Sequence, residues 1–224
     1  LLDVTVLVPV WKEQKGKEEQ VPIAYFGSTI HHTDVGGYGI GAGGRDCFEE
    51  GLWIPICKLM KEGQRNEDVW KFILSNVRQP DHMAGDLHAQ MASGEVGSQR
   101  LLTLCENHGL ENIEDLSDEI VQRSEEATRS SIKELKAGSY SSSALLDLAD
   151  GSKIDIVCSM EVDPKKGEIL VDYEGTSEAS PWGINVVENY THAYTTFTVR
   201  SVLNPDIPNN FGSLKPIKMR APKG

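Results

Sequence analysis

The residues whose types and spacing could do chemistry lie in one stretch, IAYFGSTIHHTDVGGYG, which covers residues 23–39. It places His31 and His32 side by side and follows them with Asp34. On an extended segment, the His31 imidazole and the Asp34 carboxylate can reach one cation, and both suit Zn²⁺, Mn²⁺ or Fe²⁺. Two ligands make half a site, so the same residues could instead form a polar turn in which Asp34 bonds loop amides. Spacing alone favours the turn.

Three further carboxylates are candidates for the same chemistry. Asp3 lies on the neighbouring predicted strand, where a hairpin could bring it near His31; it could equally be an edge residue. Glu50 precedes an apolar run, and Asp86 lies in GDLHAQ on a predicted helix. A solvated surface position is the simpler interpretation of both. Glu50 and Asp86 are nonetheless the residues we expect to move protons if the stretch is catalytic.

A glycine-rich segment, GGYGIGAGG (36–44), follows the histidines and has six glycines in nine residues. Gly36 and Gly37 can take positive φ and let the backbone approach a ligand, so we expect a substrate loop here. The pattern Gly39-x-Gly41-x-x-Gly44 matches the dinucleotide fingerprint literally. No helix is predicted directly after it and no βαβ unit surrounds it, so we set a nucleotide site aside.

The elements that must position these residues follow from hydrophobic periodicity. Residues 3–10 and 21–32 read as a strand hairpin joined by a charged loop at 11–20, so the histidines lie where a strand enters a loop. Helical spacing predicts a largely helical insert at about 66–138, with helices at 66–79, 81–109 and 112–138. Strands at about 140–149, 153–162 and 167–173 and a buried helix at 185–205 come next. The fold class predicted is α+β with antiparallel sheets, in three segments: 1–65, 66–138 and 139–224.

Composition narrows the class of protein. The 224 residues carry a net charge of −12, which argues against nucleic-acid and anionic-membrane partners. No apolar run is long enough to span a membrane. The four cysteines form no C-x-x-C motif, so we expect reduced thiols and a cytoplasmic protein. LLDVTVLVPV begins in mid-strand and LKPIKMRAPKG ends without a helix, so we expect an internal segment of a longer polypeptide.

Five blocks in order resemble the hydantoinase B/oxoprolinase family over essentially the whole chain. They are HHTDVGG, GRDCFEEGLWIPICKL, NVRQPDHMAGDLHAQMASGEVGSQRLL, VDYEGTSEASPWGINV and NPDIPNNFGSLKPIKMRAPKG. By this resemblance, His31 and Asp34 match a metal motif, H-x-x-D-x-G-G, and His32 ranks below them. Asp3 matches the aspartate of an upstream H-L-x-D motif, whose histidine would fall immediately before Leu1. The resemblance makes a metal site the favoured interpretation.

The family includes N-methylhydantoinase, 5-oxoprolinase, caprolactamase and the acetone and acetophenone carboxylases. The resemblance implies a metal-containing subunit of an ATP-dependent cyclic amide hydrolase, in a hetero-oligomer with a hydantoinase A-type subunit that uses ATP. The metal would be Zn, Mn or Fe, held by His31, Asp34 and Asp3. One alternative is a ketone carboxylase subunit, and a second is a non-catalytic assembly fragment. The sequence leaves the substrate, the metal and the subunit stoichiometry open.

Overall fold

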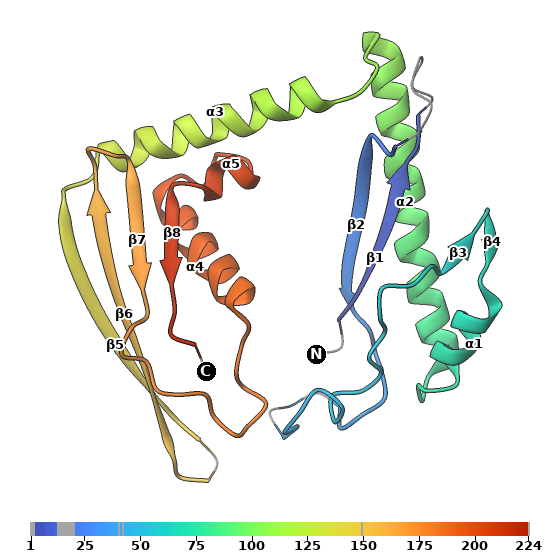
Figure 1. Cartoon of the computed structure of the whole chain (residues 1–224), viewed down its shortest axis with the longest axis horizontal. Helices are drawn as coiled ribbons and strands as arrows, with labels where there is room; N and C mark the ends of the chain where they lie inside the picture. The colour runs from blue at the N-terminus through green and yellow to red at the C-terminus, as the bar shows by residue number, and fades with distance from the viewer. Residues whose placement is uncertain (1–2, 13–20, 40, 42, 149, 224) are drawn as a thin grey trace. The chain divides into compact units, whose positions relative to one another are not determined.

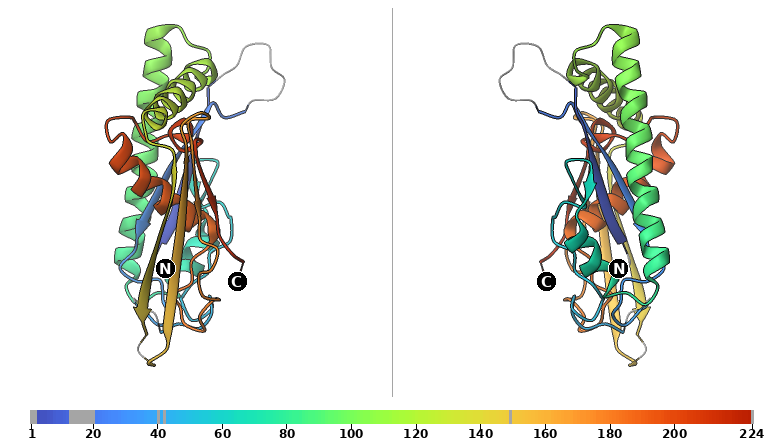
Figure 2. Two further views of the ribbon diagram at one scale, coloured as in Figure 1. Left: turned by 90° about the vertical axis from the view of Figure 1, so that its left-hand side faces the viewer. Right: turned by 90° about the vertical axis from the view of Figure 1, so that its right-hand side faces the viewer.

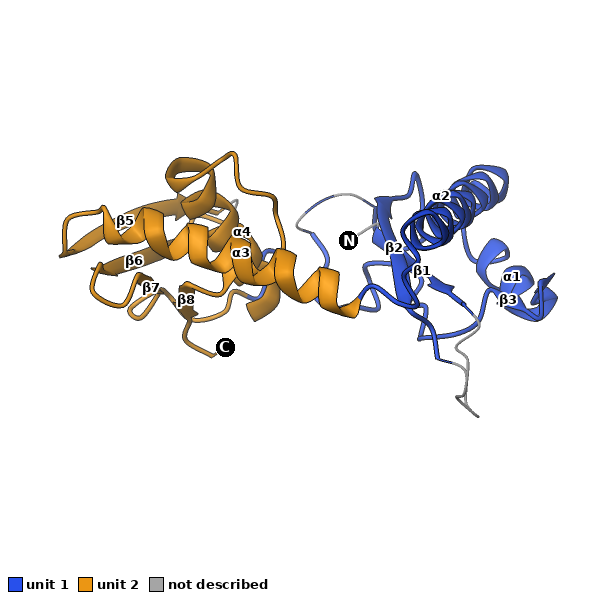
Figure 3. Ribbon diagram, turned by 90° about the horizontal axis from the view of Figure 1, so that it is seen from above, with its two compact units in different colours: residues 1–113, 181–184 blue, residues 114–180, 185–224 orange. Residues whose placement is uncertain are grey.

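The computed structural model describes residues 3–12, 21–39, 41, 43–148 and 150–223. These form two compact units: the first comprises residues 1–113 and 181–184, and the second comprises 114–180 and 185–224 (Figure 3). The loop predicted at 11–20 lies mostly outside the described residues, as do positions 40 and 42 of the glycine segment. All four cysteines are free in the structure. Among the described helices, none combines the length and apolarity that crossing a membrane requires.

The first unit is built on a hairpin of two antiparallel strands, β1 (Asp3–Val10) and β2 (Ala24–His31), confirming the prediction. Helix α2 (Pro80–His108) lies along one face of the hairpin (Figure 1). A Cβ on Gly94 would come within 2.4 Å of a Val8 methyl, and one on Gly97 within 2.7 Å of the Phe26 ring. The two glycines therefore allow α2 to lie directly on the strands.

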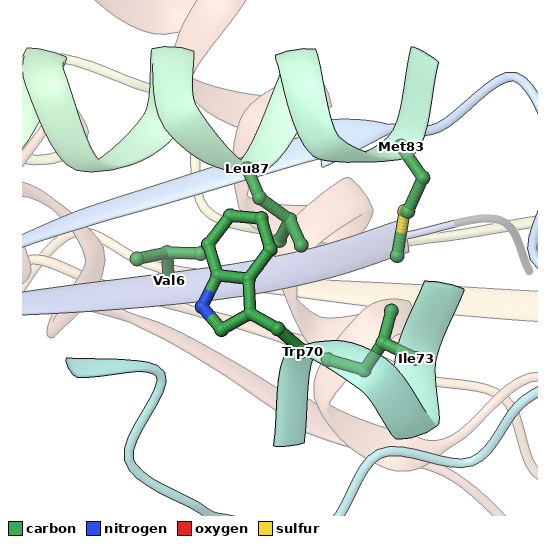
Figure 4. Packing of buried hydrophobic residues seen from close by; sticks show 5 residues of the cluster. All are labelled: Val6, Trp70, Ile73, Met83 and Leu87. Carbon is green, nitrogen blue, oxygen red and sulfur yellow. The ribbon is translucent and has the colours of Figure 1, made fainter. Parts of the chain in front are cut away.

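A small apolar core packs against the N-terminal half of α2. It is formed by Val6, Trp70, Ile73, Met83 and Leu87, all at most 6% exposed (Figure 4). Trp70 and Ile73 come from α1 (Glu67–Leu74), which follows the short hairpin β3 (Met60–Lys61) and β4 (Gln64–Arg65). The Trp70 indole N–H donates to the Leu59 carbonyl over 3.1 Å, so its one polar group is satisfied.

The boundaries of α2 follow the sequence signals, whereas α1 and α3 end at Leu74 and Lys133, before their predicted ends at 79 and 138. Pro80 is the first residue of α2, where the lack of a backbone N–H costs no hydrogen bond. Gly109 follows the last residue of α2 in the left-handed conformation, at φ 65°. The third predicted helix is α3 (Glu114–Lys133), which belongs to the second unit. The insert predicted at 66–138 is thus helical for most of its length and is divided between the two units.

The second unit holds a four-stranded sheet in the order β5-β6-β7-β8. The strands are β5 (Gly138–Asp147), β6 (Lys153–Asp163), β7 (Glu168–Asp172) and β8 (Ile217–Arg220). The β5–β6 hairpin is long, as the side views show (Figure 2), whereas β7 has only 5 residues. Ile132 of α3 packs with three sheet residues, Val162, Ile169 and Val171, to form the core of this unit. The α+β class is confirmed, although β8 adds a parallel pair with β7 that the sequence analysis did not predict.

The helix predicted at 185–205 is found as α4 (Glu188–Leu203), but only one of its faces is buried. The buried residues are Thr195, Thr196 and Arg200, whereas Phe197 and Val202 are 61% and 85% exposed. Thr195 and Thr196 each donate a hydroxyl to the carbonyl four residues earlier. Because their polarity is satisfied within the helix, the two threonines can face the interior, where Val199 and Leu203 of α4 also pack against the core. The short α5 (Phe211–Leu214) completes the unit.

Candidate functional site

The β1–β2 register brings Asp3 and His31 together. The two residues are direct partners across the hairpin, and Asp3 Oδ1 lies 2.5 Å from His31 Nδ1. Both side chains lie on the face opposite α2, with 31% and 78% of their surfaces exposed. The next pair on this face is Thr5 and Thr29, whose hydroxyls are 2.8 Å apart. The end of the hairpin therefore presents one carboxylate, one imidazole and two hydroxyls to solvent.

Asp34 has a different set of partners. One carboxylate oxygen accepts from the Gly36 N–H over 3.1 Å and from Arg78 Nη1 over 2.6 Å, and the other accepts from the Arg78 backbone N–H. Arg78 Nη2 also donates to the Gly37 carbonyl over 2.5 Å. Burial raises the pKa of Asp34, but the hydrogen bonds and the guanidinium outweigh it and hold that pKa below its usual range. Asp34 thus fastens the turn after β2 to the segment before α2.

His32 points to the side opposite His31 and is fully buried. Its Nε2 lies 3.2 Å from Gln90 Oε1, and its Nδ1 faces the Asp86 carboxylate at 3.5 Å. That second contact is an ion-pair distance without hydrogen-bond geometry, because Nδ1 has no hydrogen-bond partner among the described residues. Asp86, which lies on α2 and is one of the two predicted proton carriers, is therefore next to the His32 ring.

The glycines predicted to form a substrate loop pack against the protein's own backbone. Gly36 and Gly37 have φ of 80° and 64°, as expected for a left-handed turn. A Cβ on Gly36 would lie 2.8 Å from the Asn76 carbonyl, and one on Gly37 would lie 2.4 Å from the Gly51 nitrogen. Two backbone hydrogen bonds, Tyr38 N–H to Glu49 and Leu52 N–H to Val35, join the same segments. Contact of this loop with substrate stays a prediction.

Glu50, the other predicted proton carrier, lies in the segment that packs on Gly37 and is exposed. No group of three or more His, Cys, Asp or Glu side chains that could hold a metal forms within the described ranges. Asp3 and His31 supply one oxygen and one nitrogen donor, which fits Zn²⁺, Mn²⁺ or Fe²⁺ in chemistry but accounts for half of a ligand set. Asp34 as a third ligand stays a prediction, since its oxygens are engaged by Arg78 and Gly36.

Two residues of this region were not found by sequence reasoning. Arg78 falls within the helix predicted at 66–79 and Gln90 within the helix predicted at 81–109, and the sequence pattern assigned no role to either. Gln90 is in fact 2% exposed, and a buried amide of this kind signals a specific hydrogen-bond partner. The sequence offers one signal for Gln90: it falls among apolar positions of a helix that packs on a sheet.

Comparison with known proteins shows the family of the chain. The family model described as hydantoinase B/oxoprolinase matches residues 1–224, the whole chain. The chain belongs to the hydantoinase B/oxoprolinase family. An uncharacterized member from Methanocaldococcus jannaschii is 32% identical over 226 residues, which are 100% of this chain and 38% of that protein. The chain thus spans well under half the length of this relative.

Two solved structures show the family fold. The ATP-dependent caprolactamase of Pseudomonas jessenii aligns with a TM-score of 0.82 and 27% identity, over 98% of this chain and 37% of that chain. A nucleotide-free acetone carboxylase aligns with a TM-score of 0.83 and 20% identity, over 100% and 31% respectively. The second likeness concerns the fold alone.

Proposed function

We propose that this hydantoinase B chain supplies the metal-binding part of an ATP-dependent enzyme that opens a cyclic amide, such as a hydantoin, a lactam or 5-oxoproline. The observation that carries the proposal is the pairing of Asp3 with His31 at the open end of the hairpin. The similarity to an ATP-dependent caprolactamase supports the reaction class.

Asp3 and His31 would hold a divalent cation, Zn, Mn or Fe, which when bound polarises a carbonyl oxygen or lowers the pKa of water. Asp3 Oδ1 and His31 Nδ1 lie 2.5 Å apart, so the two donor atoms that would bind the cation are side by side. The exposure of His31 leaves the pair open to a small molecule. Asp34 would join as a ligand only by exchanging its bonds to Arg78. Glu50 and Asp86 stay candidate proton carriers in this proposal.

ATP would be used by a hydantoinase A-type partner, in a hetero-oligomer. The sequence of this chain contains no Walker A motif. The caprolactamase to which it is similar is ATP-dependent. Phosphorylation of the amide oxygen by the partner would convert a poor electrophile into one that water can attack.

The experiment uses the complete polypeptide with its partner subunit. Metal content is measured by plasma mass spectrometry, and ATP hydrolysis is followed with hydantoins, lactams and 5-oxoproline. We expect His31→Ala and Asp3→Ala to lose both bound metal and substrate-dependent ATP hydrolysis. His82→Ala, which changes an exposed histidine of the same unit, is the matched control and should keep both. Unchanged metal content and turnover in His31→Ala would show that the site assignment is wrong.

A ketone carboxylase is the second candidate, because the fold also matches acetone carboxylase. It requires ATP use that depends on bicarbonate together with a ketone. Dependence on a lactam or hydantoin excludes it in favour of the hydrolase. If the complete enzyme holds no transition metal and responds to neither substrate class, the third alternative, a non-catalytic assembly role, is the one supported.

A further inference from the structure

The side chain of Gln90 connects α2 to both strands of the hairpin. Its Nε2 donates to the Val4 carbonyl of β1 over 2.9 Å and to the Ser28 carbonyl of β2 over 2.8 Å. Its Oε1 lies 3.2 Å from His32 Nε2. Only one orientation of the amide places its two hydrogens on two carbonyls, so Oε1 must accept from His32 Nε2–H. One buried amide therefore engages three points of the hairpin.

The three residues that Gln90 contacts are close in sequence to Asp3 or to His31. Val4 follows Asp3, Ser28 lies three residues before His31, and His32 follows it. Strand side chains alternate between faces, so holding His32 against α2 places His31 on the opposite face. A slip of one residue between the strands would reverse the faces and separate His31 from Asp3.

Apolar packing also reaches this end of the hairpin, because Val4 lies against the core cluster that contains Val6. The two glycines at which α2 contacts the strands meet Val8 and Phe26, further from Asp3. A two-stranded hairpin has little stability of its own in water. The carbonyls of Val4 and Ser28 match the two hydrogens of Gln90 in a single register.

We propose that Gln90 is a positioning residue for the Asp3–His31 pair: it fixes the strand register and the orientation of His32, and thereby holds the two ligands together. The inference rests on the proposed metal role of the pair and names a residue that does not itself touch the metal. His32 is the second positioning residue, acting through its bond to Gln90.

The test measures Co²⁺ and Zn²⁺ affinity of the complete polypeptide by titration. We expect Gln90→Met, which keeps the volume and removes the hydrogen bonds, to bind metal about 10- to 100-fold more weakly. Met83→Ala is the matched control, because it opens a cavity under the same helix without touching the hairpin carbonyls. It should lose stability and keep its metal affinity. Equal affinities of Gln90→Met and Met83→Ala would overturn the positioning role.

A second pair of variants keeps the proposal testable if Gln90→Met does not fold. His32→Leu removes the donor to Gln90, whereas His32→Gln places an amide nitrogen where Nε2 lies. We expect His32→Gln to bind metal much more tightly than His32→Leu, and equal affinities would contradict the proposal. Failure of the metal site itself has a different signature: His31→Ala then binds Co²⁺ as tightly as the parent does. If His31→Ala loses metal while Gln90→Met does not, the site stands and the positioning role is wrong.

Discussion

Replacing Asp34 by Asn tests what fastens the turn after β2. The substitution keeps the size of the side chain and leaves one oxygen, which can still accept from the Gly36 N–H. It removes the charge. Because the oxygen that accepts from Gly36 also accepts from Arg78 Nη1, the new NH₂ group lies opposite the Arg78 backbone N–H. The variant therefore places two hydrogen-bond donors opposite each other at a position where the parent aspartate is only 9% exposed.

The magnitude follows from the partners. A hydrogen bond to a charged group contributes about 1.5–3 kcal/mol, and a buried donor left unsatisfied costs about 1–3 kcal/mol. The guanidinium of Arg78 is 63% exposed, so its ion pair with Asp34 adds only about 0–1 kcal/mol. Since these effects overlap, we expect a local loss of about 2–3 kcal/mol. This corresponds to a factor of roughly 30 to 140 in the opening equilibrium.

Hydrogen exchange in the native state measures that factor directly. The backbone amides of Gly36 and Arg78 both donate to Asp34, and their protection reports the free energy of local opening. We expect peptides carrying these amides to lose protection by about the factor worked out above. The control is Asp68→Asn, an exposed residue in the first turn of α1, which should leave both amides unchanged. Protection within about twofold of the parent in Asp34→Asn would refute this account of the turn.

Three further predictions concern stability. Trp70→Ala should lower the free energy of unfolding of the first unit by about 3–5 kcal/mol, since the side chain is fully buried. Far-UV circular dichroism in a denaturant titration measures this, and a loss below about 1 kcal/mol would contradict the packing. Gly94→Ala should destabilise the first unit by about 1–3 kcal/mol because its Cβ would meet Val8. The control Gly85→Ala, on the same helix, meets no other atom and should be neutral or stabilise by up to about 1 kcal/mol. Equal changes in the free energy of unfolding of the two variants, measured by denaturant titration, would refute the contact. The pKa of Asp34 is lowered in the folded state from 3.8, so its stabilising effect is present above that pH and is lost as pH falls through the folded-state pKa. The advantage of the parent over Asp34→Asn in acid titrations should therefore shrink below about pH 3.8, and a constant difference would contradict the assignment.

Much of the architecture follows from local pattern. Alternating apolar residues identify β1 and β2, the period of 3.6 identifies α1 to α4, and Pro80 and Gly109 mark the ends of α2. The α+β class follows from the order of these elements. Strand β8 was missed because its four residues are too short to show a period, and it forms only by adding to β7.

The sequence by itself determined the residue types of the site and the strand that carries them. Because successive side chains of an extended segment point to opposite faces, the neighbouring positions of His31 and His32 place them on opposite faces. Only the tertiary structure decided which partners each residue meets. Arg78, 44 residues after Asp34, donates a hydrogen bond to its carboxylate. Gln90, 58 residues after His32, lies within hydrogen-bond distance of its imidazole. Such contacts depend on how α2 packs against the hairpin, and no spacing within one strand or helix encodes the distance between two elements.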